Sequence, residues 1–121
     1  MAIQKCEDLE VYALAFDAAM RIFQLIKEYP KEETYSLVNQ IRMSSRSVAA
    51  NIREGYAKRK YPDVFVKHLN DALGSSEETV TWIDFSCQCG YLPEKQAVVL
   101  KKTYASIGAM LYQLMKGWQK F

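Results

Sequence analysis

Apolar residues recur three and four positions apart in four separate stretches of this chain, which is the spacing of one face of an α-helix. The stretches predict helices over about residues 7–29, 32–58, 62–89 and 93–119. No stretch of comparable length alternates apolar and polar residues as a half-buried strand would. Because the connections are short, consecutive helices should run antiparallel. The sequence therefore predicts an all-α, up-down-up-down antiparallel four-helix bundle, formed by a single domain over residues 1–121.

Two prolines, a glycine and two glutamates mark the predicted helix ends. Pro30 ends the first helix because a proline nitrogen has no hydrogen to donate. Glu32 and Glu33 suit the positive end of the second helix dipole. Pro62 fits the first turn of the third helix, where the missing N–H costs nothing, and Gly90 fits the left-handed position after its last turn.

The first helix differs from the others because it is apolar on two sides. One stripe comprises Leu9, Tyr12, Phe16, Ala19, Phe23 and Ile26, and the second comprises Val11, Ala15, Ala18, Ile22 and Leu25. A helix that is apolar on two sides is buried on two sides. Two interpretations stay open: one stripe contacts another subunit, or the helix is central to its own bundle.

Each of the other three helices shows one apolar face. The spacing on the fourth helix favours shallow, nearly antiparallel packing. In chain order, the three faces comprise Leu37, Ile41, Ser45, Val48, Ile52 and Tyr56; Phe65, Leu69, Ala72, Ser76, Val80, Ile83 and Cys87; and Ala97, Leu100, Tyr104, Ile107, Leu111, Leu114 and Trp118.

Small residues inside helices indicate places where backbones approach closely. Gly74 and Gly108 each cost about 1 kcal/mol relative to alanine in a helix interior, whereas Gly55 lies near a helix end and could partly be a terminator. Ala49 and Ala50 are small too, so we expect the second and third helices to pack tightly around them.

Polar residues near these positions must find hydrogen-bond partners if they are buried. We interpret them as a structural network that sets the register of the helices, and the alternative is a binding or catalytic site. The residues are Asn51, Glu54, Ser75 and Glu78.

Composition narrows the class of protein. Of 121 residues, 50% are hydrophobic and 25% are charged, which is typical of a globular domain. The first residues lack the apolar core of a secretory signal, and no run of about 18 apolar residues could span a membrane. Cys6, Cys87 and Cys89 are odd in number, which favours reduced thiols. We therefore expect a cytoplasmic protein.

The net charge of +2 conceals segments that alternate in sign. Residues 1–35 hold four basic and seven acidic groups, and residues 36–70 hold seven basic and two acidic groups. Residues 71–100 hold one basic and five acidic groups, and residues 101–121 hold four basic and no acidic groups. Either the segments neutralise one another across the bundle, or the second helix presents a basic surface.

Three arginines form one ridge on the second helix. At 100° per residue, Arg46 lies about 40° and Arg53 about 20° from Arg42, roughly 110° from the apolar face. Lys58, Arg59 and Lys60 extend the ridge at the helix end, where Tyr56 and Tyr61 could stack on bases. Guanidinium groups grip phosphate oxygens, so the ridge predicts binding to the backbone of RNA or DNA.

Three other interpretations of the ridge remain open. It could be a solvated face, it could pair with acidic residues such as Glu77 and Glu78 on a neighbouring helix, or its arginines could face another subunit. A scaffold that binds a polypeptide partner through apolar flanks and this ridge is the alternative function.

Catalytic and metal chemistry find little support in these residues. The one histidine, His68, has no glutamate three residues before it, as a di-iron bundle requires. Cys87 and Cys89 are two apart and would point to different sides of a helix, so a zinc site with His68 is not expected. No phosphate loop or nucleophile elbow occurs. We expect no enzyme, no cofactor and no metal.

Five motifs resemble the bacterial 23S rRNA intervening-sequence proteins, which are four-helix-bundle proteins sometimes labelled ribosomal. The longest is Q-I-R-x-S-x-R-S-V-A-A-N-I-R-E-G-Y at residues 40–56. The others are C-E-D-L-E-V-Y-x-x-A from Cys6, Y-P-K-E-E-x-Y-x-L at residues 29–37, L-x-x-A-x-G-S-x-x-E at residues 69–78, and G-Y-L at residues 90–92.

The resemblance implies a four-helix bundle that assembles as a ring-like homopentamer. A role in RNA or ribosome biology is implied by the place of some of the family's genes inside rRNA intervening sequences. The chain is also distantly similar to accessory proteins of diversity-generating retroelements, which are thought to bind nucleic acid and a reverse transcriptase. Arg53 replaces a residue that is commonly small in the family, and Tyr61-Pro62 replaces the usual serine-type helix cap.

Overall fold

A computed structural model describes residues 3–118 of the chain. This part contains four long helices, α1 (Glu10–Leu25), α2 (Leu37–Ala57), α3 (Pro62–Gln88) and α4 (Glu94–Trp118), and no strand. Three short 3-10 helices, η1 (Cys6–Asp8), η2 (Ile26–Glu28) and η3 (Lys31–Glu33), flank α1 and precede α2. The predicted all-α fold class is confirmed. Gln119, the predicted last residue of the fourth helix, lies outside the described residues.

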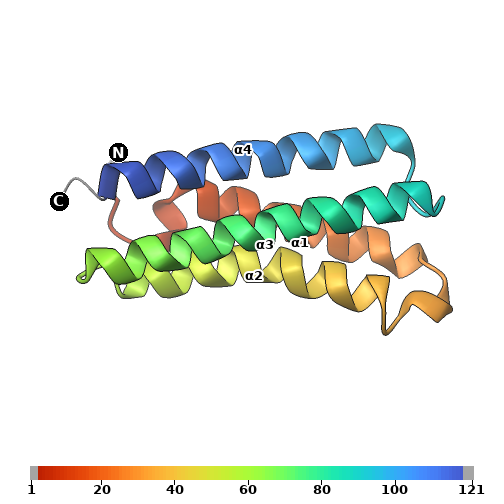
Figure 1. The fold of residues 1–121 in the computed structure, drawn as a ribbon, viewed down its shortest axis with the longest axis horizontal. Helices are drawn as coiled ribbons and strands as arrows, with labels where there is room; N and C mark the ends of the chain where they lie inside the picture. The colour runs from red at the N-terminus through yellow and green to blue at the C-terminus, as the bar shows by residue number, and fades with distance from the viewer. Residues whose placement is uncertain (1–2, 119–121) are drawn as a thin grey trace.

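The four helices lie side by side along one long axis, and each runs opposite to the one before it (Figure 1). Helix α1 packs against α2 and α4, and α3 packs against the same two helices. The pairs α1/α3 and α2/α4 therefore lie on the diagonals of the bundle. As a consequence, the α1/α2 side and the α3/α4 side are opposite faces of the molecule.

The connection between the first two helices differs from the prediction. The regular α-helix stops at Leu25, and α2 begins at Leu37 rather than at residue 32. Glu33 precedes α2 instead of forming its first turn. Its Oε1 accepts hydrogen bonds from the Ser36 hydroxyl at 2.6 Å and from the Leu37 N–H at 3.4 Å. The carboxylate thus caps the start of α2, which also suits the dipole of that helix.

Glu33 also fastens this connection to the turn between α3 and α4. Its Oε2 accepts a hydrogen bond from the Tyr91 hydroxyl at 2.9 Å, and the Tyr91 ring packs against Tyr29. That turn is closed by Gly90, whose φ of +82° confirms the predicted left-handed position. One carboxylate therefore holds both connections at this end of the bundle.

The hydrogen bonds of Glu33 make the stability of the folded chain depend on pH. The Ser36 and Tyr91 hydroxyls lower the pKa of the Glu33 carboxyl in the folded state, so the unfolded chain binds the proton more tightly. The stabilisation is complete above the unfolded pKa, near 4.3, and is lost as pH falls through the lower folded pKa. We expect Glu33→Gln to remove this part of the pH dependence. Urea unfolding midpoints measured from neutral to acid pH, compared with the unchanged chain, test this expectation.

The core resolves which stripe of α1 faces inward. The buried positions on α1 are Val11, Ala15, Ala18 and Ile22, all of which belong to the second stripe. The middle of the first stripe is open: Phe16 is 49% exposed. The helix is therefore not central to its own bundle. On α2, all six predicted core residues are buried, whereas Thr79 and Ser86 join the predicted face of α3.

Of the glycines, Gly55 rather than Gly74 marks the close approach between backbones. A Cβ on Gly55 would stand 2.6 Å from the Cβ of His68 on α3. A Cβ on Gly74 would meet no atom within 4 Å, and one on Gly108 would meet only Leu73 Cδ1 at 3.5 Å. The expectation for Gly74 was therefore wrong, and Gly55 is more than a helix terminator. Helices α2 and α3 make the most extensive contact of the four neighbouring helix pairs.

The cysteines, the possible metal ligands and the hydropathy of the helices bear on further expectations from the sequence. Cys6 is buried, Cys87 is partly buried and Cys89 is exposed, and all three are free thiols. Burial raises the pKa of the Cys6 thiol. Within residues 3–118, no group of three histidine, cysteine or acidic side chains could hold a metal ion, and no helix is long and apolar enough to cross a membrane.

Candidate nucleic-acid interface

The arginine ridge of α2 lies along the border with α1. The Arg46 guanidinium lies 6.0 Å from the centre of the Phe23 ring, and that of Arg53 lies 5.8 Å from the Tyr12 ring. Arg42 donates a hydrogen bond to Asn39 Oδ1 at 3.3 Å on its own helix. The predicted ridge is thus one row, but Arg46 and Arg53 stand beside the open stripe of α1.

Arg53 has an acidic partner at the surface. Its Nη1 lies 3.3 Å from Glu7 Oε2, and both side chains are about half exposed. A backbone hydrogen bond at Glu7, followed by the Arg53 side chain, lowers the pKa of the Glu7 carboxyl. Exposed pairs of this kind contribute little to stability, because water screens the two charges. Arg53 is therefore partly neutralised, but it is not locked inside the molecule.

The basic cluster at the end of α2 is held by aromatic rings and by the backbone. The Arg59 guanidinium lies 4.0 Å from the centre of the Tyr56 ring, and its Nη1 donates to the Tyr56 carbonyl at 3.0 Å. Lys60 Nζ lies 5.9 Å from the centre of the Tyr61 ring, which is 61% exposed. Lys58 instead pairs with Glu54 at 2.9 Å. This end of the bundle combines exposed cations with an exposed aromatic ring.

The predicted cations divide into two groups. Arg53 and Lys58 have carboxylate partners. In the part of the chain that the structure describes, four others have no carboxylate oxygen within 4.0 Å: Arg42, Arg46, Arg59 and Lys60. Among the described residues, no ion pair joins the ridge to Glu77 or Glu78. Glu78 instead accepts a hydrogen bond from Trp82 of its own helix. These four groups keep their capacity to bind an anion.

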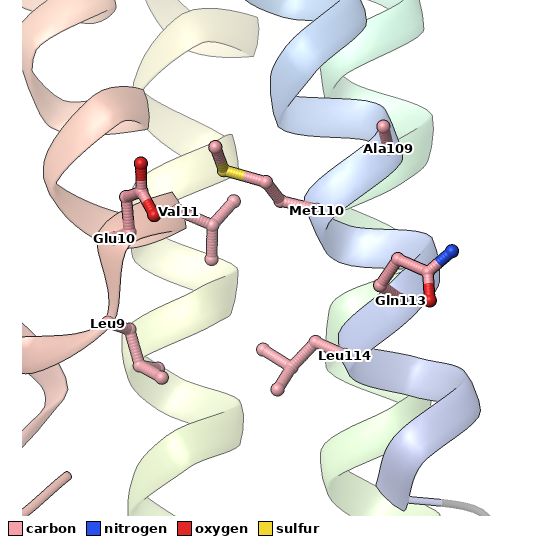
Figure 2. Close-up of a pocket in the computed structure, with 7 residues that line it drawn as sticks. All are labelled: Leu9, Glu10, Val11, Ala109, Met110, Gln113 and Leu114. Carbon is pink, nitrogen blue, oxygen red and sulfur yellow. The ribbon is translucent and has the colours of Figure 1, made fainter. Parts of the chain in front are cut away.

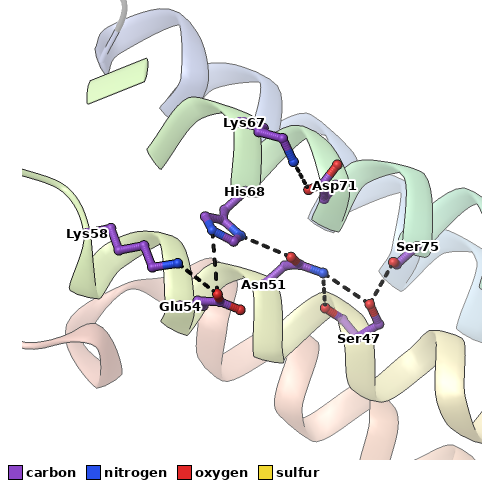
Figure 3. A network of polar contacts seen from close by, with 8 residues as sticks. All are labelled: Ser47, Asn51, Glu54, Lys58, Lys67, His68, Asp71 and Ser75. Atoms are coloured by element: carbon purple, nitrogen blue, oxygen red, sulfur yellow. Dashed lines mark hydrogen bonds and ion pairs between the residues drawn. The ribbon is translucent and has the colours of Figure 1, made fainter. Parts of the chain in front are cut away.

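A polar network joins α2 and α3, and it contains three of the four predicted residues (Figure 3). Ser75 shares a 2.9 Å hydrogen bond with Ser47, and the Asn51 amide nitrogen donates to the Ser47 carbonyl at 3.0 Å. This fixes the Asn51 oxygen as an acceptor, so it receives a hydrogen bond from His68 Nδ1 at 3.2 Å. His68 Nε2 lies 3.8 Å from Glu54, whose pKa is lowered by the Lys58 ammonium.

The network was predicted only in part. Asn51, Glu54 and Ser75 belong to it, whereas Glu78 does not. Ser47 and His68 were missed, although the His68 side chain is only 13% exposed. Helical spacing could have found both residues, because Ser47 lies four positions before Asn51 and His68 lies seven before Ser75. The arrangement joins two helices by side-chain hydrogen bonds, which favours its structural interpretation.

An open groove runs along α1 and α2 beside the arginine row, and we call it the α1/α2 groove. One part has a volume of about 360 Å³, and a second part of about 310 Å³ continues it toward Glu7. Ala49 and Ala50 line this groove and face α1. The expectation that they pack against the third helix was wrong. The groove is lined by Tyr12, Phe16, Ala19, Met20, Phe23, Arg46, Ala49 and Ala50, then by Glu7, Ala13, Asp17 and Arg53.

A second groove, of about 480 Å³, separates the start of α1 from the end of α4. Figure 2 shows Met110 and Leu114 of α4 facing Val11 and Leu9 across it. Among the described residues that line this groove, Glu10 is the one ionisable group. A single carboxylate on apolar walls supplies no pair of groups for acid–base or nucleophilic chemistry. The groove is a hydrophobic seam between two helices.

The comparisons with known proteins agree with the fold. A family model described as 23S rRNA-intervening sequence protein matches residues 7–113. A crystal structure of a protein with unknown function from the S23 ribosomal protein family of Bacteroides thetaiotaomicron is 27% identical to this chain, with a TM-score of 0.79. The match covers 88% of this chain and 95% of that one. No curated protein matches the sequence.

Proposed function

The chain belongs to the 23S rRNA-intervening sequence protein family, as its motifs predicted, and from this membership we propose that it is a self-assembling helical bundle that binds the backbone of RNA or DNA. The family name refers to ribosomal RNA. The structure supplies cations on an accessible surface, and within residues 3–118 it assembles no nucleophile with a base. We therefore propose binding rather than catalysis.

One observation carries the proposal: four cationic side chains of the ridge lack a carboxylate partner within the described residues. Arg59 and Lys60 are the best placed of them, because they lie just after the end of α2, where Arg59 packs on the Tyr56 ring and Lys60 lies beside the exposed Tyr61 ring. Arg59 is held by the Tyr56 ring and carbonyl, so less freedom is lost when it contacts a phosphate. The Tyr61 ring offers a face on which an unpaired base could stack.

The mechanism is electrostatic and independent of base sequence. Each phosphate that a lysine or arginine neutralises releases condensed counterions, and this release drives association. A single cluster of two or three cations binds weakly. The resemblance implies a homopentamer, and a ring would present the cluster five times, so that weak contacts add up to useful avidity. Assembly is therefore part of the proposed function.

Polynucleotide binding should fall steeply with salt concentration. Replacing Arg59 and Lys60 together by alanine removes two phosphate contacts, and we expect the slope of log affinity against log salt to become shallower by about 1.4–1.8. Fluorescence anisotropy with labelled RNA and DNA over a salt series measures this slope. An affinity that changes neither with the salt concentration nor with the double substitution contradicts the proposal.

Two further double variants sharpen this experiment. Replacing Lys27 and Lys31 by alanine removes the same charge from the connection between α1 and α2, at the other end of the bundle, and should leave the slope close to that of the unchanged chain. Replacing Arg42 and Arg46 by alanine should also weaken binding. Light scattering on the same samples shows whether that loss accompanies a change in mass, which would assign these arginines to assembly.

The open stripe of α1 supports a second candidate, a scaffold for a polypeptide partner. Phe16 and Met20 are 49% and 45% exposed, which is a large apolar surface for one helix. A protein that co-purifies in fixed stoichiometry after nuclease treatment, and is lost with Phe16→Asp, would favour this function. Retention of nucleic acid without such a protein would favour the first proposal.

A further inference from the structure

The α1/α2 groove presents apolar side chains that the described residues leave uncovered. Phe16 and Met20 stand at its centre, and the guanidinium groups of Arg46 and Arg53 lie along its wall. Alanines form the α2 side, so the surface is shallow and a packed helix could approach it closely. The groove therefore has the composition of a protein interface, with apolar residues and arginines.

The opposite face of the bundle carries a hollow, which we call the α3/α4 hollow. It has a volume of about 530 Å³ and is lined by Asn70, Leu73, Tyr112, Met115 and Lys116. Gly74 follows Leu73 on α3, in the middle of the helix, and no atom lies within 4 Å of the place where its Cβ would stand. This glycine costs the helix about 1 kcal/mol, and packing within the chain does not account for it.

The groove and the hollow lie at the same height along the bundle. Phe16 lies between Tyr12 and Phe23, which contact Arg53 and Arg46 of α2. That part of α2 is joined to α3 by the Asn51–His68 and Ser47–Ser75 hydrogen bonds. Asn70 and Leu73 lie between His68 and Ser75. A neighbouring copy could therefore bring its groove onto this hollow without sliding along the helix axis.

The charges of the two faces are complementary. Helix α2 carries three arginines and one glutamate, and α3 carries five acidic residues and one lysine. Helix α1 carries two acidic residues and one arginine, and α4 carries four lysines and one glutamate. When one copy is placed beside another in the same orientation, α2 meets α3 and α1 meets α4. Every helix then faces one of opposite sign.

We propose that one copy of this chain docks its α1/α2 groove onto the α3/α4 hollow of a second copy, with the long axes of the two bundles pointing in the same direction. This inference rests on the self-assembly in the proposed function and specifies the surfaces that make it. Phe16 and Met20 fill the hollow, and Gly74 leaves room for them. A head-to-tail contact of this kind uses two different surfaces, so it repeats from copy to copy, and it closes into a ring when the rotation between neighbouring copies divides a full turn.

The proposed docking gives the predicted cations two different roles, contact between copies and binding of phosphates. Arg46 comes close to the height of Glu77, whose carboxylate has no hydrogen-bond or ion-pair partner among the described residues. Arg46 and Arg53 then serve the contact between copies. The turns between α2 and α3 all lie on one rim of the ring, which repeats Arg59 and Lys60 around it. The rim is the surface left to bind phosphates.

Two single substitutions, one on each face, test the inference. Phe16→Asp places a charge in the groove, and Gly74→Arg places bulk and positive charge on the hollow side, where the chain itself leaves space. We expect each variant alone to have the mass of one chain, 13.9 kDa, by light scattering. An equimolar mixture should form a dimer of about twice that mass, because each variant supplies the face that the other lacks. Circular dichroism checks that both variants are folded.

Tyr35→Asp is the matched control, because it removes a 93% exposed aromatic ring that lies on neither face. It should keep the mass of the unchanged chain. If Gly74→Arg alone keeps that mass, or if the mixture stays monomeric, the head-to-tail contact is wrong although assembly itself stands. If the unchanged chain is monomeric up to high micromolar concentration, self-assembly fails as well.

Discussion

Phe65→Ala should destabilise the folded chain by about 3–5 kcal/mol, which is the usual cost of removing a large aromatic side chain from a core. Phe65 is fully buried, and its ring packs edge-on against Trp118 at 4.7 Å and Tyr56 at 6.3 Å between ring centres. The substitution leaves a cavity at the end of the bundle where α2, α3 and α4 meet. A small domain has roughly 5–15 kcal/mol of stability in total, so much of it would be lost.

Urea unfolding at one fixed protein concentration measures this loss, because assembly makes the midpoint depend on concentration. Phe85→Ala is the matched control on the same helix. The Phe85 side chain is 53% exposed, so its removal should change the free energy of unfolding by less than about 0.5 kcal/mol. Equal losses for the two variants would mean that Phe65 is not the core residue described above.

Gly55→Ala should also destabilise the chain, by about 1–3 kcal/mol, although alanine is the better helix former. The new methyl group would stand 2.6 Å from His68 Cβ and 3.0 Å from Phe65 Cδ1. The Cβ of His68 is fixed to the backbone and cannot rotate away, so α2 and α3 must move apart. That movement would strain the hydrogen bond between Asn51 and His68.

Gly108→Ala is the comparison for this glycine. Its methyl group would meet only the flexible end of Leu73, at an ordinary 3.5 Å. We therefore expect a gain of up to about 1 kcal/mol from helix propensity. Urea unfolding midpoints measure the change in the free energy of unfolding for each variant. A loss for Gly55→Ala and a gain for Gly108→Ala would establish that close approach is specific to the α2/α3 contact. Losses of equal size at both positions would contradict it.

The candidate site shows where reasoning from spacing succeeds and where it fails. The ridge of Arg42, Arg46 and Arg53 lies on one row, as a helical wheel requires. The wheel could not tell that this row borders α1, because the rotation of α2 about its own axis depends on its neighbours. Glu78 is an instructive error: proximity in sequence suggested the polar network, but its carboxylate turns to Trp82 instead.

His68 was missed as a member of the network for a related reason. A lone polar residue on a helix is ordinarily solvated, and its spacing from Ser75 shows only that the two residues share a face of α3. It becomes half of an interhelical hydrogen bond only because Gly55 lets α2 and α3 approach. The sequence therefore pointed to Gly74 as the position of close approach, whereas the structure places that approach at Gly55. A missing side chain is visible in a sequence, whereas the atom that would collide with it is not.

The sequence by itself determined the four helices, their order and most of their buried positions, because helical periodicity is a property of neighbouring residues along one chain. It also contained the family motifs and the arginine row. Only the tertiary structure decided which stripe of α1 enters the core, which glycine marks the close contact, and which cations lack an acidic partner. Those features depend on residues far apart in sequence, and the packing of four helices against one another sets the distances between them.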